Sequence, residues 1–283
     1  MVSTTQIILL LLSILAYLAG GISALASLMG KKLTLSRGLA LSVGLILSGS
    51  LLIWHSVTVT VVGHEGSWQP LQDNFSAMLT LAVLLAAFVG YVQIKRPMPS
   101  LEWLTMPIVI LLLLMAGHFG TTQPNAYART AYSVAHRLTT YVGAVAFMVA
   151  GITGVMYLLS DHSLRGRKSH LPPRPGVFGS LERLERLTYT SVTIGFALFS
   201  VGLIVGIAWL RHDGGSERMG PTWYLSPKVV LSVAAWLLFA VVLHTPIAPR
   251  LRGRKNAILS IAGMLFTLAA IIAVLLMPAG GAN

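Results

Sequence analysis

Four histidines lie within or at the edge of long apolar stretches, where an imidazole ring needs a hydrogen-bond partner or a bound metal. They are His55, His118, His136 and His244. Ionisable side chains are costly in hydrocarbon, so histidines at such depth indicate a functional role. The chemistry open to them is axial ligation of a heme iron or the relay of protons.

The other residue types favour heme over a proton path or a catalytic centre. The chain has only eight Asp and Glu residues, and we expect none of them within a membrane span, whereas proton paths usually rely on buried carboxylates. There is no cysteine, which excludes thiolate metal sites and disulfides. The sequence also has no phosphate-binding loop, dinucleotide fingerprint or nucleophile elbow, so no catalytic residue is predicted.

The favoured heme ligands are His55 and His136, which lie on apolar stretches that run in opposite directions. Imidazoles from two helices of a bundle can approach one iron from opposite sides. In the alternative interpretation, each histidine only hydrogen-bonds across helices or lies among lipid headgroups. His118 could replace either ligand, although an interfacial histidine needs no such role. Each ligand also needs an acceptor for its second ring nitrogen, and the nearby candidates are Ser50, Ser56, Thr139 and Thr140.

His244 lies at the end of another apolar stretch and has no histidine at a similar depth. As a metal ligand it would need a partner polypeptide or a five-coordinate iron, and otherwise it is a helix-end histidine at the membrane boundary. Lys228, at the start of the same stretch, is unfavourably placed in the dipole of a helix, which predicts a nearby anion. A heme propionate and a lipid phosphate both fit. Trp223 and Arg137 complete the candidate heme-binding residues.

The composition indicates an integral membrane protein. Hydrophobic residues make up 55% and charged residues 10% of the 283 residues, and the mean hydropathy is +0.78. Soluble domains carry about 25% charged residues. No polar block is long enough for a soluble domain, so we predict a single membrane domain over residues 1–283.

The predicted fold class is all-α, a polytopic membrane helix bundle with about eight transmembrane helices. A helix needs about 20 mostly apolar residues to cross a bilayer, and the strands of a barrel would be shorter and would alternate. The predicted spans are residues 5–28, 39–62, 75–95, 103–120, 134–158, 187–211, 228–248 and 256–277.

The distribution of basic residues predicts the orientation of these spans. Of the 20 Lys and Arg residues, 15 fall in one alternate set of loops, which the positive-inside rule assigns to the cytoplasm. Both termini are then extracytoplasmic, with His55, His118 and His136 near the outer face and His244 near the inner one. The net charge of +12 is therefore explained by membrane topology and membrane lipid, and nucleic-acid binding is not expected.

Two serines are predicted to cap helices that lead into the membrane. Ser180 would begin a short amphipathic interfacial helix before the span at 187–211. Ser226 would cap the span at 228–248, with Pro227 in the first helical position.

The order of several motifs within residues 73–265 resembles the cytochrome c assembly protein family, closest to its CcsA-like heme-handling branch and HemX-like relatives. Residues 223–244 are similar to the family's tryptophan-rich segment and the intramembrane histidine that follows it. The complete set of motifs lies at residues 73–79, 135–141, 181–189, 194–196, 206–209, 223–228, 231–232 and 236–244.

This resemblance implies heme handling near the outer face for cytochrome c maturation. His136 would be an outer axial ligand of heme b, and His244 would be an intramembrane ligand completed by a partner subunit. Trp223 and the loop around it would shelter the heme. The implied partners are a CcsB/ResB-like membrane subunit and a periplasmic c-type cytochrome, and the implied location is a bacterial inner membrane.

Three residues depart from the family's tryptophan-rich motif, namely Leu225, Ser226 and Val229, and no second outer histidine follows the last span. His55 could then serve as the second outer ligand. That substitution suggests an alternative function, a fixed heme b electron-transfer subunit of a larger respiratory complex between quinol and a periplasmic cytochrome. A third possibility is a scaffold without heme that regulates heme-synthesis enzymes.

Overall fold

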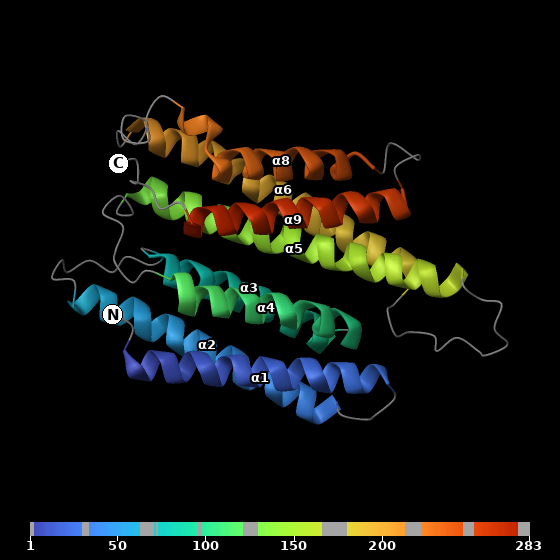
Figure 1. Ribbon diagram of the computed structural model, residues 1–283. Coiled ribbons are helices and arrows are strands. Elements are labelled where there is room, and N and C mark those ends of the chain that lie inside the picture. Colours follow the sequence, from blue (N-terminus) through green and yellow to red (C-terminus); the bar gives the residue numbers. More distant parts are fainter. Residues whose placement is uncertain are drawn as a thin grey trace. The chain divides into compact units, whose positions relative to one another are not determined.

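The computed structural model describes residues 3–29, 34–62, 71, 73–95, 98–120, 130–165, 180–212, 222–245 and 252–276. The secondary structure assigned within these ranges is helical throughout. In chain order (Figure 1), the helices are α1 (Thr4–Leu28), α2 (Thr34–Val62), α3 (Asn74–Lys95), α4 (Pro99–Phe119), α5 (Ala131–Arg165), α6 (Leu181–His212), the 3-10 helix η1 (Trp223–Leu225), α8 (Pro227–Leu243) and α9 (Arg254–Leu276).

Seven of these helices are long and apolar enough to cross a membrane. The eighth, α8, has 17 residues and is about 25 Å long, slightly short of a hydrocarbon core of about 30 Å. The prediction of an all-α, polytopic membrane fold is therefore confirmed, and the chain is a multi-pass membrane protein.

Two helices extend well beyond their predicted spans. α5 continues to Arg165 and α6 begins at Leu181, so the predicted amphipathic entry to the span at 187–211 forms the first turns of α6. The predicted cap at Ser180 is confirmed, because its hydroxyl accepts a hydrogen bond from the Arg183 amide at 3.3 Å. These charged helix ends continue because a helix outside the hydrocarbon does not need apolar residues.

Glu102 contradicts the expectation that no acidic residue lies within a span. It belongs to a candidate membrane span of α4, Ser100–Phe119, and is only 1% exposed. Its place in the first turn of α4, three residues after the helix-starting Pro99, explains this. A carboxylate there interacts favourably with the positive end of the helix dipole.

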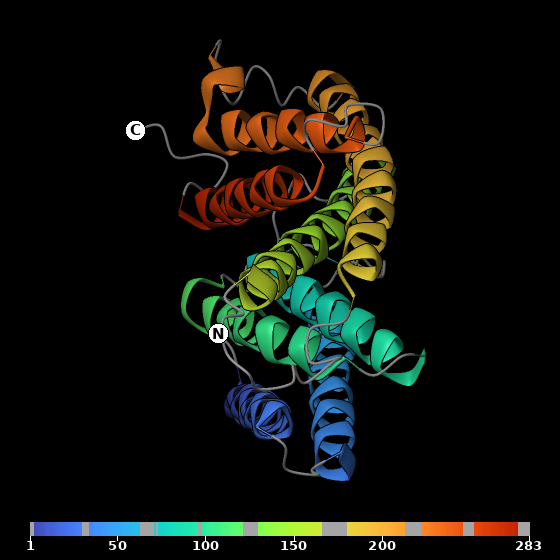
Figure 2. The ribbon, with the colours of Figure 1, turned by 90° about the vertical axis from the view of Figure 1, so that its right-hand side faces the viewer.

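The first compact unit, Met1–Thr130, is a ring of four helices. α1 packs against α2 and α4, and α3 packs against the same two helices (Figures 1 and 2). Its core holds Tyr17, which is fully buried and shares a hydrogen bond of 2.9 Å with Ser48 of α2. The ring of Tyr17 lies directly against Gly44, so α1 and α2 approach closely there.

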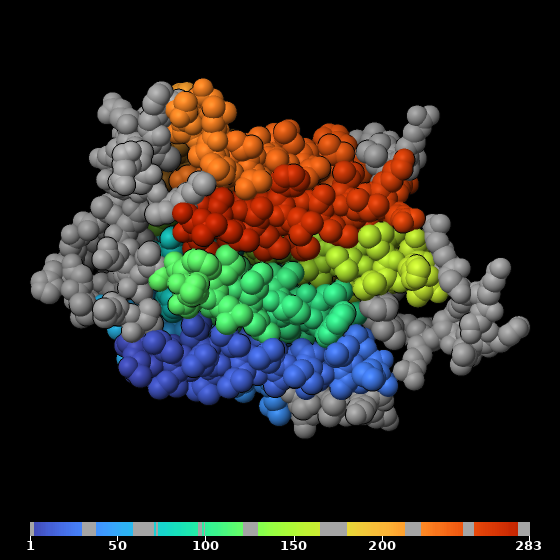
Figure 3. Space-filling view, viewed as in Figure 1, coloured from blue at the N-terminus to red at the C-terminus, as the bar shows by residue number. Residues whose placement is uncertain are grey.

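The second compact unit, Ala131–Asn283, has the same ring of neighbours. α5 packs against α6 and α9, and α8 packs against the same two helices, with α8 and α9 in contact along their length in Figure 3. Phe147, Phe199 and Phe239 form its core, and the rings of Phe147 and Phe239 stack with centroids 3.8 Å apart. The prediction of one membrane domain is not tested by this division and stays a prediction.

Candidate functional site

His136 lies in the second turn of α5, where it contacts the neighbouring helix α6. Its Nδ1 is 2.7 Å from the carbonyl oxygen of Gly202 and 3.4 Å from the Thr140 hydroxyl. A carbonyl oxygen can only accept, so Nδ1 carries the proton of the neutral ring and Nε2 keeps a lone pair. Metal-ligating histidines commonly hold their second nitrogen in this way.

Two glycines of α6 let α5 approach closely at and next to His136. A Cβ atom at Gly206 would lie 2.8 Å from Nδ1 and Cε1 of that ring, and one at Gly202 would lie 2.5 Å from the Thr140 hydroxyl. Only glycine permits this approach of α5 to α6. One turn further along α6, the Trp209 ring stacks over His136 with centroids 6.2 Å apart. The imidazole is therefore fixed in position by its own unit.

His244 has the same hydrogen-bond arrangement at the C-terminal end of α8. Its Nδ1 donates to the carbonyl of Ala240 at 2.6 Å, and the side chain is exposed. Its Nε2 is therefore also left with a lone pair. His244 thus satisfies the same chemical requirement for a metal ligand as His136.

The two histidines lie at opposite ends of the second unit. His136 contacts Gly202 and Trp209 of α6, whereas Thr245, next to His244, lines a pocket with Tyr189 of the same helix. At 1.5 Å per residue, Tyr189 and Gly202 are about 20 Å apart along α6. His136 and His244 therefore cannot hold one iron together, as the predicted difference in their depth implies.

The other predicted heme-binding residues of this unit lie at its helix starts. Trp223 is half-buried in η1, with its ring against Tyr224 at 6.1 Å. Lys228 is half-buried in the first turn of α8, and Arg137 follows His136 in α5 and is also half-buried. Ser226 is in the predicted cap position before Pro227, but its hydroxyl makes no capping bond, so this part of the prediction is wrong.

Four buried polar atoms of the second unit have no hydrogen-bond partner in the part of the chain that the structure describes, and they include the hydroxyl of Ser160 and Oδ1 of Asn256. The other two are the indole Nε1 of Trp209 and the hydroxyl of Ser226. Buried polar groups are nearly always paired, so such atoms are places where a bound molecule can supply the missing partner. Trp209 is the more informative of the two, because its ring lies over His136.

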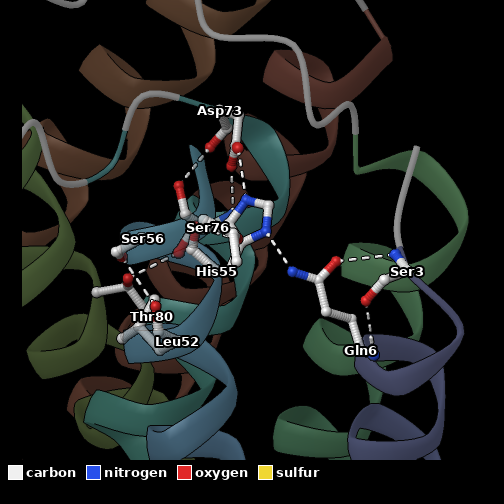
Figure 4. A network of polar contacts seen from close by, with 9 residues as sticks. Ser3, Gln6, Leu52, His55, Ser56, Asp73, Ser76 and Thr80 are labelled. Carbon is white, nitrogen blue, oxygen red and sulfur yellow. Dashed lines mark hydrogen bonds and ion pairs between the residues drawn. The ribbon is translucent and has the colours of Figure 1, made fainter. Parts of the chain in front are cut away.

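His55 of the first unit is bonded at both ring nitrogens (Figure 4). Its Nε2 is 2.6 Å from a carboxylate oxygen of Asp73, and its Nδ1 is 3.3 Å from the side-chain amide of Gln6. The ring is 2% exposed and lies against Phe75 with centroids 4.7 Å apart. The predicted partners Ser50 and Ser56 bond instead to backbone carbonyls of their own helix.

The His55 network joins the ends of three helices. Asp73 precedes α3 and also accepts a hydrogen bond from the Ser76 amide at 2.6 Å. Gln6 and Ser3 form a reciprocal capping box at the start of α1, and the same Gln6 reaches His55 of α2. Chemically, a buried imidazole–carboxylate pair can hold a proton, but His55 could bind a metal only by losing one of its partners.

The remaining histidines show no comparable arrangement in the described ranges. His118 is exposed near the end of α4, with its ring edge-on to Phe119 at 4.5 Å. His212 is the last residue of α6, and its ring centroid lies 5.4 Å from that of Tyr132. The sequence pattern places His162 and His212 in loops between the spans, but both lie within helices, because α5 and α6 extend beyond their predicted spans. His64 and His170 lie outside the described residues.

The structure brings together fewer of the predicted residues than the sequence pattern suggested. His55 and His136 belong to different compact units, and their pairing on one iron stays a prediction. No group of three or more His, Cys, Asp or Glu side chains that could hold a metal ion occurs among the described residues. A heme needs only one or two imidazoles, so this excludes a multi-carboxylate metal centre there but not a heme ligand.

Comparison with known proteins identifies the family. A family model described as "Cytochrome C assembly protein" matches residues 42–280. Curated relatives named "Cytochrome c biogenesis protein CcsA" include one from Prochlorococcus marinus (strain NATL2A), 38% identical over 107 residues, which are 38% of this chain and 32% of the relative. That from Cyanophora paradoxa is 26% identical over 227 residues, covering 75% of this chain and 69% of the relative.

Another relative of the same name, from Synechococcus sp. (strain RCC307), is 29% identical over 224 residues, covering 75% of this chain and 66% of the relative. The chain thus spans about a third of the length of the Prochlorococcus relative and about two thirds of the other two. No solved structure matches the chain. Because the family model covers most of the sequence, across both compact units, this chain belongs to the cytochrome c assembly protein family.

Proposed function

We propose that this chain handles heme b near the outer face of a bacterial inner membrane for cytochrome c maturation. His136 is the outer axial ligand, and Trp209 and Trp223 shelter the heme. Its partners are a CcsB/ResB-like membrane subunit and a periplasmic c-type cytochrome. Both chain termini lie on the outer side, since 15 of the 20 basic residues fall in the opposite set of loops.

The observation that carries this proposal is the hydrogen bond from His136 Nδ1 to the Gly202 carbonyl, 2.7 Å long. It fixes the tautomer in which Nε2 can donate its lone pair, and it holds the ring in one orientation. Bound heme supplies an iron that accepts such a nitrogen. The unpaired Nε1 of Trp209 and the basic side chains of Lys228 and Arg137 suit the polar and carboxylate groups of the same ligand.

His244 supports a second heme position at the inner end of the same unit. Its Nδ1 bond to Ala240 gives the same tautomer, and its exposed ring is open to a ligand from a partner subunit. The two positions are separated by about 20 Å along α6. A chain with two separate imidazoles of this kind suits a protein that passes heme on.

The alternative, a fixed bis-histidine heme for electron transfer, requires His55 as the second outer ligand. Ligation by His55 would leave either Asp73 or Gln6 without its buried partner. An unpaired buried carboxylate is costly, so the geometry of the first unit favours a structural histidine there. Heme transfer is therefore the better supported of the two functions.

Titration of the purified, full-length protein with heme tests the proposal. We expect a Soret band and a pyridine hemochrome spectrum of heme b for the unmodified chain. His136→Ala should lose the band contributed by the outer position, and His136→Gly should regain it with added imidazole. The matched control is His118→Ala, an exposed histidine whose loss should leave the spectrum unchanged.

A transfer assay separates the two functions. Heme-loaded protein, with its membrane partner, is mixed with a reduced apocytochrome c, and covalent heme attachment is followed by heme staining. Attachment that depends on His136 supports maturation. A low-spin heme that stays bound to the protein and is oxidised and reduced reversibly would favour the electron-transfer subunit. The absence of any Soret band would rule out both functions.

A further inference from the structure

The second unit contains a polar pocket far from His136. It is an open pocket of about 240 Å³, lined by the start of α6, the end of α8 and the start of α9. The first turns of α6 contribute Glu182, Glu185 and Arg186, and the residues before α9 contribute Arg252. Carboxylates and guanidinium groups therefore line one cavity, which neither a bare cation nor a bare anion would match.

A buried acceptor in this pocket lacks a partner. Asn256 lines the pocket and is 7% exposed, and its Oδ1 has no hydrogen-bond partner in the described part of the chain. A carbonyl oxygen only accepts, so the missing partner must be a donor. The carboxylates of Glu182 and Glu185 favour a positively charged donor, such as an ammonium group.

The pocket lies at the depth of lipid headgroups. α6 has 32 residues and is about 48 Å long, whereas the hydrocarbon core of a bilayer is about 30 Å thick. Its far end carries Arg211 and His212, so both ends project beyond the hydrocarbon. Tyr189, which also lines the pocket, is the type of residue enriched at the membrane surface.

We propose that this pocket binds the headgroup of a zwitterionic phospholipid that carries both a phosphate and an ammonium, as in phosphatidylethanolamine. Arg186 and Arg252 contact the phosphate, and Asn256, Glu182 and Glu185 accept from the ammonium. A divalent cation would lie beside two guanidinium groups, and an anionic headgroup would face two carboxylates, so each fits worse. This site lies far from His136 and beside His244, and the proposed function does not assign it.

The test is native mass spectrometry of the full-length, heme-free protein released from nanodiscs with equal amounts of phosphatidylethanolamine and phosphatidylglycerol. We expect the unmodified chain to retain phosphatidylethanolamine roughly tenfold more often, as bonds to charged groups imply. Equal retention, or a preference for phosphatidylglycerol, would overturn the proposal.

Two variants examine the residues. Asn256→Leu removes the buried acceptor at similar volume and should abolish the preference, whereas Ser260→Ala, one turn further along α9, should keep it. Ser260 is a matched control because it is buried and bonds only to the Asn256 backbone carbonyl at 2.9 Å. A preference that survives Asn256→Leu contradicts the assignment.

Glu185→Gln keeps the test decisive if Asn256→Leu fails to fold. The side chain is half-buried, and its loss leaves two guanidinium groups with one carboxylate fewer. We expect retention to shift toward phosphatidylglycerol, and an unchanged preference would overturn the proposal. A large excess of free phosphoethanolamine should not displace the lipid, because the acyl chains anchor it. Displacement at low concentration would assign the pocket to a soluble ligand.

Discussion

The histidines of the two compact units differ in how many ring nitrogens the protein already uses. His55 is bonded at both, to a carboxylate and an amide, and is buried in a contact of three helices. His136 and His244 are bonded only at Nδ1, each to a backbone carbonyl. In the first arrangement both ring nitrogens are hydrogen-bonded within the protein, and the histidine links helices. In the second arrangement one ring nitrogen is available to bind a metal.

The two arrangements should also differ in how much they contribute to stability. A buried ion pair is weak evidence of stability, but removing one member leaves an uncompensated polar or charged group. The substitution of a residue in the His55 network should therefore lower the free energy of unfolding and leave ligand binding alone. The substitution of a residue around His136 should in contrast weaken heme binding, whether or not it also lowers the free energy of unfolding.

The largest effect is expected for Asp73→Ala in the first unit. It removes the 2.6 Å contact to His55 Nε2 and the cap bond to the Ser76 amide. Breaking a buried pair on one side costs about 3–5 kcal/mol. The free energy of unfolding, measured by denaturant titration in mixed micelles, should fall by that amount, while heme affinity per folded molecule is unchanged.

Asp73→Asn is the matched control, because its side-chain oxygen can still cap α3. It should be destabilised by less than Asp73→Ala. The double variant His55→Leu, Asp73→Ala should lose less than the sum of the single variants, because neither partner is left alone. If the double variant instead loses the exact sum of the two single losses, the contact between His55 and Asp73 contributes nothing to the free energy of unfolding.

The next effect is expected for Gly206→Ala in the second unit. The new Cβ would lie 2.8 Å from the His136 ring, which must move. Overpacking of this kind lowers the free energy of unfolding by about 1–3 kcal/mol. Because the displaced ring is the proposed iron ligand, heme binding should weaken as well. Heme titration and unfolding of the same sample measure both effects.

Gly49→Ala is the control for that substitution, since a Cβ at Gly49 meets nothing within 4 Å. Alanine stabilises an open helical position by about 0.5–1 kcal/mol relative to glycine. We therefore expect Gly206→Ala to lower the free energy of unfolding and Gly49→Ala to raise it. If both variants bind heme as the unmodified chain does, the packing around His136 has no part in ligation.

The helices were predictable because their apolar stretches are long, but their ends were less so. Hydropathy falls where charged residues begin, whereas α5 and α6 continue through Asp161 and Glu182. Glu102 was excluded from its span for the same reason. A helix beyond the hydrocarbon leaves no hydropathy signal, and only a cap such as Ser180 marks it.

The hydrogen-bond partners of the histidines were harder to predict than the candidate histidines themselves. The acceptor for His136 is a backbone carbonyl, which carries no residue signal. The glycines Gly202 and Gly206 are the signal of close helix approach that could have located it. Asp73 is 18 residues beyond His55, across a loop. An aspartate at a helix start, at the same membrane depth as a histidine, is the signal that could have identified it.

A smaller effect is expected for Gln6→Ala, which makes His55 resemble His136. It removes the 3.3 Å bond to His55 Nδ1 and half of the capping box of α1. The loss should be about 1 kcal/mol, measured again by denaturant titration. The number of hemes bound per chain should not change, because Asp73 still holds Nε2 in a buried position; an additional heme in this variant would mean that the ring can serve as a ligand.

The smallest effect is expected for Ser226→Ala, in contrast to Ser180→Ala. Both serines precede helices, but only Ser180 accepts a capping bond, from the Arg183 amide. Its loss should cost about 1 kcal/mol, whereas the loss of the unpaired, buried Ser226 hydroxyl should change the unfolding free energy by less than about 0.5 kcal/mol. If Ser226→Ala instead weakens heme binding, then the hydroxyl contacts the bound heme, and the outer site extends to the start of α8.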